Sequence, residues 1–397
     1  MTSMCIERTP ESPAPMSILP LTFVSTLLHA YVGWRLLPAL AGLGWAQVAL
    51  AVTLILSAAL MPWGLLARRV RSKPLAQLLS WAGLLFMGLC SSLVVLTVVR
   101  DLGLLLAHLV LLVLPTAFNP HTVALWSAAG VVLAALAITL IGLWNARRTA
   151  AVVVVEVPIR DLPAGLHGFS IAQISDIHIG PTIQRGYLQA IVDAVNRLGV
   201  DMVAVTGDLV DGTVDELGRH VAPLAGLSSR HGTYFVTGNH EYYSGAHAWI
   251  IELRRLGVRV LMNEHVVLEH GEASLLVAGV TDYSAHRFDP SHRSDPQASL
   301  REAPEHARIR VLLAHQPRSA AAAALAGFHL QLSGHTHGGQ FLPWNFLVRL
   351  QQPFTAGLHR LKDLWVYTSR GTGYWGPPKR FGAPSEITHL RFVNAVT

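Results

Sequence analysis

The sequence predicts two unlike parts, an N-terminal α-helical bundle of about four transmembrane spans followed by an α/β domain. About half of the 397 residues are hydrophobic and 14% are charged, well below the roughly 25% charged residues of a typical soluble protein. Long apolar stretches lie before residue 150, and short apolar runs alternate with helical stretches after it. The predicted boundaries are a disordered leader at 1–15, a transmembrane domain at 16–148 and an α/β domain at 149–397.

The charged residues are divided in the same way. Residues 1–150 hold 9 basic and 3 acidic residues, whereas residues 151–397 hold 21 of each. The basic excess therefore belongs to the membrane-like part, and no nucleic-acid partner is expected, because such binding needs a basic patch on the folded domain. The two cysteines, Cys5 and Cys90, supply neither a disulfide framework nor a thiolate metal site.

The apolar stretches predict the spans. The leader lacks the basic and apolar regions of a cleaved signal peptide. The first stretch is the least apolar because it contains His29 and Arg35. Stretches that reach the roughly 20 residues needed to cross a bilayer cover residues 17–39, 42–66, 76–99 and 121–145.

The basic residues between the spans predict the orientation. The segment 102–114 is apolar but short, so it either lies at the interface or continues the third helix. With four spans, the basic loop at 68–73 and the pair Arg147 and Arg148 lie on one side, which the positive-inside rule makes cytoplasmic. If 102–114 also crossed, that pair would lie outside. We therefore expect an integral protein of the cell (inner) membrane, with the α/β domain on the cytoplasmic side, the lipid bilayer as a partner and no obligate protein partner.

Ionisable residues in the apolar half allow two interpretations. Charged groups inside a membrane often mark a transport pathway, which would make the chain a transporter or membrane scaffold whose α/β domain senses phosphate or nucleotide. His29 and Asp101 support this alternative. In the other interpretation, Arg100 and Asp101 form a helix end in the headgroup region and His29 packs against a neighbouring helix.

The second half alternates short apolar runs with helical stretches. Such alternation predicts an α/β domain in which helices cover a sheet. Helices are predicted at 186–198, 246–256 and 320–326, and strands at 150–157, 169–174, 202–205, 233–236, 275–278, 311–314, 330–332, 364–368 and 387–392.

Polar residues follow five of these strands within one to three residues. They are Asp176, Asp208, Asn239, His315 and His335. Ligands of α/β sheets bind beyond the carboxyl ends of the strands, so five separate segments are expected to meet at one edge.

The residue types in these segments predict metal chemistry. Carboxylate and amide oxygens together with imidazole nitrogens, without sulfur, suit two divalent ions such as Mn, Fe or Zn. Two such ions about 3.5 to 4 Å apart would hold a hydroxide between them and stabilise a phosphate during in-line displacement. Each motif alone is common in turns, but the ordered set of five is specific.

The five blocks together resemble the signature of the calcineurin-like metallophosphoesterases. The resemblance covers residues 168–393 and implies two mixed β-sheets sandwiched between helices. The blocks are Asp176-Ile177-His178, Gly207-Asp208, Gly238-Asn239-His240-Glu241, His315 and Gly334-His335-Thr336-His337.

The resemblance also implies a role for each residue. His240 would contact the phosphate and protonate the leaving oxygen, since an alkoxide is a poor leaving group. One metal would be bound by Asp176, His178 and His337, the second by Asn239, His315 and His335, and Asp208 would bridge the two.

Three tail segments, namely Gly338-Gly339-Gln340, 367–373 and 375–386, are similar to the membrane-associated bacterial branch of the family. A relative in that branch resembles an enzyme that hydrolyses UDP-2,3-diacylglucosamine. Arg370 and Arg380 are candidates for holding a substrate phosphate, with a structural salt bridge or a loop anchor as the alternative. The apolar cluster at 341–347 belongs either to the core or to the bilayer interface. The sequence thus predicts a membrane-anchored phosphoesterase that cuts a phosphomonoester, phosphodiester or pyrophosphate bond, with either a lipid-linked or a small soluble substrate.

Overall fold

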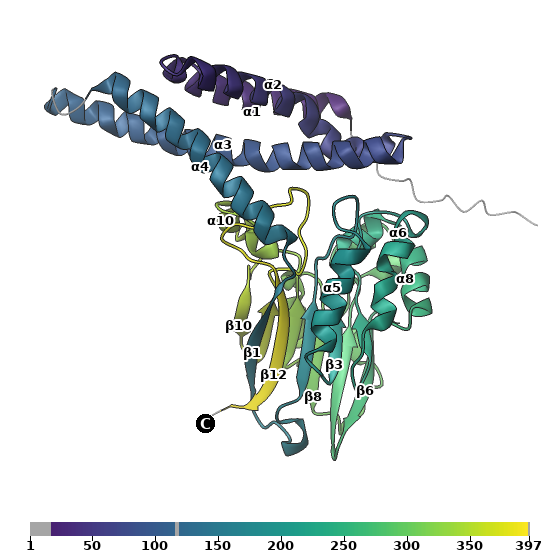
Figure 1. Ribbon diagram of the computed structural model, residues 1–397. Coiled ribbons are helices and arrows are strands. Elements are labelled where there is room, and N and C mark those ends of the chain that lie inside the picture. The colour runs from purple at the N-terminus through teal and green to yellow at the C-terminus, as the bar shows by residue number, and fades with distance from the viewer. Residues whose placement is uncertain (1–16, 116–118, 396–397) are drawn as a thin grey trace, which may run out of the picture. The chain divides into compact units, whose positions relative to one another are not determined.

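The computed structural model describes residues 17–115 and 119–395 and divides the chain into two compact units (Figure 1). The first unit is Met1–Val131 and the second is Val132–Thr397. The leader predicted at 1–15 lies outside the described residues.

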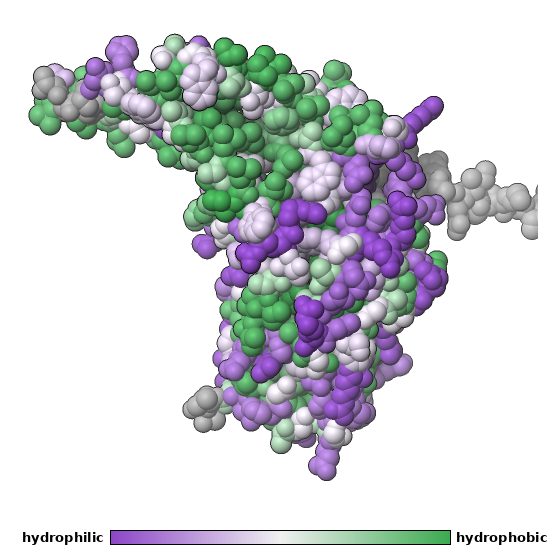
Figure 2. Space-filling model, viewed as in Figure 1, coloured by the Kyte–Doolittle hydropathy of each residue, from purple (hydrophilic) through white to green (hydrophobic). Residues whose placement is uncertain are grey.

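The N-terminal helices match the predicted spans in position. Figure 2 shows hydrophobic side chains over much of their surface. Among the described residues, three helical segments are long and apolar enough to cross a membrane, namely Gly44–Arg69, Lys73–Val113 and Pro120–Arg147. The first expected span is also a helix but is not among these three. The helices are α1 (Ile18–Leu36), α2 (Gly44–Leu66), α3 (Lys73–Val113) and α4 (Pro120–Arg147).

Helix α3 is continuous over 41 residues. The short apolar segment 102–114 is therefore a continuation of the third helix, one of the two alternatives that the sequence left open. At 1.5 Å per residue, α3 extends about 60 Å, roughly twice the hydrocarbon thickness of a bilayer. If α3 crosses a bilayer, part of it lies outside the hydrocarbon layer or the helix is steeply tilted.

The prediction that Arg100 and Asp101 form a helix end is wrong, because both lie inside α3. The helix continues because partners on neighbouring helices satisfy the two charges. Arg35 Nε of α1 lies 2.9 Å from Asp101 Oδ2. Arg100 Nε donates to Ser127 Oγ of α4 over 2.9 Å.

His29 packs against neighbouring hydroxyl and carbonyl groups, as the second interpretation of this residue predicted. Its Nδ1 lies 2.7 Å from the Ser25 carbonyl oxygen, and its Nε2 lies 2.7 Å from Ser57 Oγ of α2. The two residues that supported a transport pathway, His29 and Asp101, thus have partners within the bundle.

The second unit contains two mixed sheets within its described residues. The first has the strand order β1-β12-β2-β3-β4-β5 and the second β10-β11-β9-β8-β7-β6. Strands β2 to β5 run parallel, as do β11, β9, β8 and β7. The bounds are β1 (Ala151–Ile159), β2 (Ser170–Ile174), β3 (Met202–Val205), β4 (Thr233–Phe235), β5 (Arg259–Val260), β6 (Glu264–His270), β7 (Ala273–Gly279), β8 (Ile309–Leu313), β9 (Leu330–Ser333), β10 (Gly357–Leu361), β11 (Leu364–Thr368) and β12 (Glu386–Asn394).

Period-two alternation of the strand residues builds the layers. In β3, Met202 and Ala204 face a core shared with Leu275 and Val311 of the second sheet. Val203 and Val205 point the other way and belong to a different core, on the outer face of the first sheet. Successive side chains of a strand point to opposite faces, so one buried strand serves both cores.

Helices cover the outer faces. The predicted arrangement of two sheets between helices is therefore confirmed for this unit. Residues of α5, α6 and α8 join the outer core of the first sheet, and residues of α9 join that of the second. The bounds are α5 (Arg185–Asn196), α6 (Val214–Val221), α7 (Asn239–Tyr243), α8 (Ala246–Arg255), α9 (Ala320–Leu325) and α10 (Trp344–Val348).

All nine predicted strands are present. The sequence missed β5, β6 and β10, which are edge strands in the order of their sheets. Edge strands are often short or polar because one side is unpaired. Strand β5 has two residues, the apolar residues of β6 are flanked on both sides by glutamate and histidine, and β10 contains histidine and arginine, so none has a long apolar run.

Candidate metal centre

The predicted polar segments all follow carboxyl ends of parallel strands. Asp176, Asp208 and Asn239 come after β2, β3 and β4 of the first sheet. His315 and His335 come after β8 and β9 of the second sheet. The side chains of four of them, all but Asn239, belong to the ligand groups described next.

Among the described residues, four groups of side chains have ligand atoms close enough to hold a cation, and three of these groups share members at the strand ends. In each group the ligand atoms lie within 4.8 Å of one another. Asp208 belongs to two of the three groups, and so does His178. The groups are Asp176, His178 and His337; Asp208, His315 and His335; and His178, Asp208 and His240.

The nearest ligand atoms are 3.0 to 3.2 Å apart in two of these groups, and His178 Nε2 lies 3.8 Å from Asp208 Oδ2 in the third. His178 Nε2 lies 3.0 Å from His337 Nε2, and His335 Nδ1 lies 3.2 Å from His315 Nε2. His315 Nε2 lies 3.1 Å from Asp208 Oδ2. Burial lowers the pKa of His315, but the negative charges of Asp208 and neighbouring carboxylates raise it well above its ordinary value overall. The site thus favours positive charge at this point.

Asn239 provides a separate test of whether a metal fits. Its Oδ1 atom is buried and has no hydrogen-bond partner among the described residues. A buried amide oxygen without a partner is costly, and a cation would satisfy it as an oxygen ligand. The residues present therefore fit a site for two metal ions.

Hydrogen bonds orient two of the expected ligands. His315 Nδ1 lies 2.7 Å from the Thr206 carbonyl oxygen. When that nitrogen donates its hydrogen, Nε2 keeps its lone pair towards the cluster. The Asp176 carboxylate accepts from the His335 backbone N–H at 2.8 and 3.0 Å, which joins the end of β2 to the end of β9.

The backbone is strained at these positions. Among the described residues, ten non-glycine residues have a positive φ. Residues other than glycine seldom adopt this region, and such strain concentrates at functional sites. Five of the ten are expected metal ligands, namely Asp176, His178, Asp208, His335 and His337, with φ between 51° and 71°.

Two glycines permit the close approach of the ligand loops. A Cβ atom on Gly238 would lie 2.2 Å from Asp208 Oδ1, and one on Gly334 would lie 2.1 Å from Asp176 Oδ2. Only a residue without a side chain lets the neighbouring backbone come this near to a carboxylate.

The sequence missed Asp211, which contacts two imidazoles at once. Asp211 Oδ1 lies 2.5 Å from His240 Nδ1 and 3.3 Å from His178 Nδ1. Burial lowers the pKa of His240, but the charges of Asp208 and Asp211 raise it to about 9 overall. In the sequence, only the position of Asp211, three residues after Asp208 on the same loop, could have indicated that it belongs to the site.

Glu241 joins the two loops around the site. Its fully buried carboxylate accepts from the backbone N–H groups of Gly238, Asp208 and Leu209 at 2.6, 3.0 and 2.8 Å. Burial and the neighbouring charge of Asp208 raise the pKa of Glu241 to about 8. The sequence placed Glu241 in a motif but gave it no role.

Arg370 and Arg380 contact protein groups. Arg370 Nη1 forms an ion pair of 2.8 Å with Glu386 Oε2, and its side chain is 37% exposed. The Arg380 side chain is fully buried and donates to the carbonyl oxygens of His337 and Arg370 at 2.9 and 2.8 Å. Burial lowers the pKa of Arg380 to about 10. These contacts correspond to a salt bridge and a loop anchor, the alternatives that the sequence left open.

Arg380 also contacts the last turns of α4, which belong to the second unit. Its backbone N–H donates to the Gly142 carbonyl oxygen over 2.9 Å, and its own carbonyl accepts from Asn145 Nδ2 over 3.2 Å. The Arg380 Nη2 atom lies 3.0 Å from His337 Nδ1. One residue therefore joins the end of a potential spanning helix to an expected metal ligand.

The apolar cluster at 341–347 is mostly on the surface. Phe341 is buried, but Leu342, Phe346 and Leu347 are 46%, 61% and 50% exposed. The core interpretation is therefore wrong for these side chains. The short helix α10 packs on the turn His337–Gly339.

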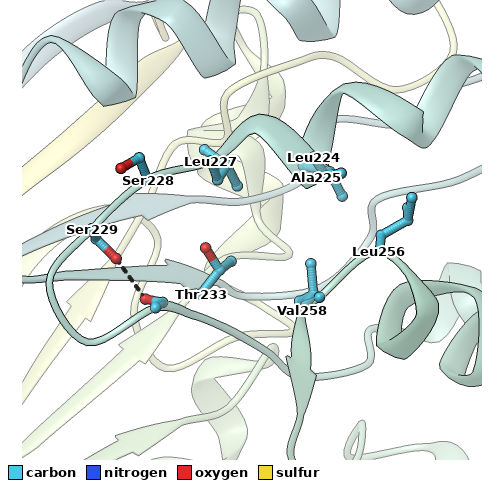
Figure 3. A pocket seen from close by; sticks show the side chains of 10 residues that line it. Leu224, Ala225, Leu227, Ser228, Ser229, Thr233, Leu256 and Val258 are labelled. Atoms are coloured by element: carbon cyan, nitrogen blue, oxygen red, sulfur yellow. Dashed lines mark hydrogen bonds between the residues drawn. The ribbon is translucent and has the colours of Figure 1, made fainter.

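A pocket of about 250 Å³ lies away from this site. Its lining includes Thr233, where β4 begins, and Val258, just before β5, so it is at the amino ends of these strands (Figure 3). Small and apolar residues such as Leu224, Ser228 and Leu256 line it, without carboxylates or imidazoles. It therefore has no part in the metal chemistry.

Comparison with known proteins agrees with this geometry. Residues 169–339 match the family model for calcineurin-like phosphoesterases. A transmembrane protein with a metallophosphoesterase domain from Danio rerio is 40% identical over 257 residues, covering 63% of this chain and 59% of the relative. The protein of the same description from Bos taurus is 42% identical over 265 residues, covering 64% and 59%.

A bacterial relative is covered more fully. An uncharacterised metallophosphoesterase from Aquifex aeolicus is 32% identical over 228 residues, covering 57% of this chain and 85% of the relative. The chain spans about three-fifths of the length of the two vertebrate relatives. With the family match, the bacterial relative and the buried His/Asp groups, the chain belongs to the calcineurin-like metallophosphoesterase family.

Proposed function

We propose that the chain is a membrane-anchored hydrolase of phosphoric esters that uses two divalent metal ions. The observation that carries this proposal is the meeting of two buried ligand groups at the carboxyl ends of strands from both sheets, with Asp208 among them. Asp176, His178 and His337 would hold one ion, and Asn239, His315 and His335 the other, with Asp208 shared. Mn, Fe and Zn all suit this set of oxygen and nitrogen donors.

The contacts of His240 and Asp211 indicate a separate role for each of them beside the metal ions. Two cations bound here would polarise the phosphoryl oxygens and lower the pKa of a water molecule. His240 is partly exposed beside Asp208 and is held by Asp211, which favours its protonated form. It can therefore give a proton to the departing oxygen of the ester. Asp211 acts through His240 by fixing its orientation and charge.

Replacing Asp211 by Asn should lower kcat and shift its pH dependence. Loss of a carboxylate that orients an active imidazole costs roughly 10- to 100-fold. Because the charge of Asp211 raises the pKa of His240, its removal lowers that pKa. A proton donor is lost as pH rises through its pKa, so the alkaline limb of kcat/KM should move to lower pH. The measurement is a pH profile with an alkyl phosphodiester, whose departing alkoxide needs the proton.

Asp215→Asn is the matched control for this change, because Asp215 is an exposed carboxylate in the first turn of α6. Its profile should coincide with that of the parent chain. An alkaline limb that stays in place in the Asp211 variant would refute the role given to Asp211.

The surface next to the site supports a lipid-linked substrate. Leu342, Phe346 and Leu347 are exposed, and Leu350 beyond α10 is 82% exposed. The exposed Trp375 ring lies 5.7 Å from the His240 ring, so the apolar surface reaches the proposed proton donor. Exposed apolar residues in such number mark a site of interaction.

The same surface is held near the end of α4. The Leu342 backbone N–H donates to the Phe381 carbonyl oxygen over 3.0 Å, and the preceding residue, Arg380, donates to Gly142 of α4. If α4 spans the bilayer, its last turns reach the headgroup region, where Trp144 is 68% exposed. The apolar surface would then contact the acyl chains of a lipid-linked substrate, while the metal ions bind its phosphate. UDP-2,3-diacylglucosamine is one substrate of this chemistry.

A double change, Phe346→Ser with Leu347→Ser, should reduce hydrolysis of a phosphoester presented in vesicles by about tenfold or more. The loss of two apolar contacts of roughly 1 kcal/mol each accounts for this figure. Hydrolysis of a soluble aryl phosphodiester should be unchanged. Leu325→Ser is the control, because Leu325 is 78% exposed on α9. Equal loss on both substrates would exclude a lipid-binding role for the surface.

The substrate itself is identified by incubating the Mn-loaded chain with a membrane lipid extract and with a UDP-linked lipid. Mass spectrometry should detect a phosphate-containing product from one of them. If neither gives a product while an aryl ester is hydrolysed, the substrate is a small soluble ester. We also propose, from the basic loop at 68–73 and the positive-inside rule, that residues 149–397 form a cytoplasmic catalytic domain.

A further inference from the structure

The fourth group of potential metal ligands lies outside the catalytic cluster. His247 is in the first turn of α8, Asp289 directly precedes the short 3-10 helix Pro290–His292, and His292 is the last residue of that helix. His247 Nε2 lies 3.1 Å from Asp289 Oδ2, and His292 Nε2 lies 3.8 Å from the same oxygen. The three ligand atoms all lie within 4.8 Å of one another.

Hydrogen bonds already orient two members of this group. The Tyr242 hydroxyl lies 2.9 Å from His292 Nδ1, the ring nitrogen that does not face Asp289. Asp289 Oδ1 accepts from the backbone N–H and the hydroxyl of Ser291 at 2.9 and 2.6 Å, so Oδ2 is directed to the histidines. Metal-binding imidazoles and carboxylates are oriented by such outer contacts.

The spacing of the group fits one zinc ion. Tetrahedral zinc binds nitrogen and oxygen at about 2.0 to 2.2 Å, which places neighbouring ligand atoms about 3.4 Å apart. The distances of 3.1 and 3.8 Å from Asp289 Oδ2 lie on either side of this value. Imidazole is mostly uncharged at neutral pH and can give its lone pair to a metal.

We propose that His247, Asp289 and His292 form a third metal site, separate from the catalytic pair, that binds one Zn²⁺ with water in the remaining position. Three protein ligands and one open position complete a tetrahedron. The exposure of the His247 side chain, 72%, gives the ion access from solvent.

A zinc ion here would connect the loop before the 3-10 helix to the segment that carries the catalytic groups. Tyr242, which orients His292, belongs to α7 together with Asn239 and His240. Phe288 of the loop packs against the Tyr242 ring at 5.8 Å. The ion would therefore stabilise the position of α7 without touching the substrate. This proposal does not depend on the proposed activity.

The test uses the full chain in detergent, stripped with a chelator, dialysed against zinc and analysed for metal by mass spectrometry. His247→Ala should bind one zinc ion fewer per chain than the parent. Its melting temperature should also lose part of the rise that zinc gives the parent chain. His286→Ala is the matched control, since His286 lies on the same loop and in none of the ligand groups, and it should keep the full count.

A second variant separates this site from the catalytic one. Asp208→Asn should lose catalytic metal but keep the zinc ion that His247→Ala loses, so the double variant should lose both. Equal zinc counts for the parent and His247→Ala would overturn the proposal and leave these residues as an ion pair. Because His247 is exposed, the variant is expected to fold.

Discussion

Replacing Asp208 by Asn is expected to lower kcat/KM for an aryl phosphodiester by roughly 10³-fold or more, because the loss of metal-based stabilisation is worth several kcal/mol. Asp208 lies in two of the three catalytic ligand groups, and its Oδ2 is 3.1 Å from His315 Nε2. The amide keeps the size of the side chain but removes the negative charge that offsets two cations. The measurement pairs steady-state kinetics with metal content per chain.

Two controls make this result specific to the charge. Asp215→Asn changes an exposed carboxylate on α6 and should leave activity and metal content unchanged. The melting temperature of the metal-free Asp208 variant shows whether its fold is retained. Full activity of a folded Asp208→Asn chain would exclude a shared ligand at this position.

Replacing His240 by Ala is expected to reduce turnover of alkyl phosphoesters by about 10²- to 10⁴-fold, the usual contribution of a general acid. Its Nδ1 contacts Asp211 at 2.5 Å, while its Nε2 lies 4.0 Å from Asp208 Oδ2 at the centre of the cluster. An alkoxide needs a proton to depart, whereas 4-nitrophenolate is already stable. The loss should therefore be much smaller for a 4-nitrophenyl ester.

The comparison between the two esters serves as the internal control. A variant that has lost its metals or its fold would lose both activities alike, so metal content is measured on the same preparation. Equal losses for the two esters, with metal retained, would contradict proton donation by His240 and would assign it to substrate binding.

The sequence predicted the site because strand ends and ligand types are both local features. Asp176, Asp208 and His335 each follow a short apolar run within three residues, so the apolar runs located them without knowledge of the sheet order. The family resemblance then supplied the pairing of the two sheets. The strand pattern alone permitted that pairing but did not determine it.

Contacts between distant segments account for what was missed. Asp211 contacts His178 and His240 only because three separate segments lie together in the fold. The proposed third metal site likewise combines His247 and His292 from separate segments. Arg100 and Asp101 remain inside a helix because Arg35 and Ser127 approach from other helices. Arg380 is buried because carbonyl oxygens from several loops surround it. None of these partners is close in sequence.

The apolar cluster at 341–347 shows a different limit of the sequence. Its composition suits a core, and only the packing of α10 on the metal-ligand turn reveals that Phe346 and Leu347 face outwards. A cluster of hydrophobic residues indicates that these side chains are shielded from water, but the sequence alone does not distinguish a protein core from a lipid-contacting surface.

The most direct test of the central claim is metal-dependent turnover by the full chain in detergent. After removal of metal with a chelator, hydrolysis of an aryl phosphodiester should stop, and addition of Mn²⁺ should restore it with about two ions bound at the catalytic groups. Zinc is kept out of this assay so that the third site stays empty. Substrate binding without turnover in the Mn-loaded chain would contradict the account and indicate a domain that only senses phosphate.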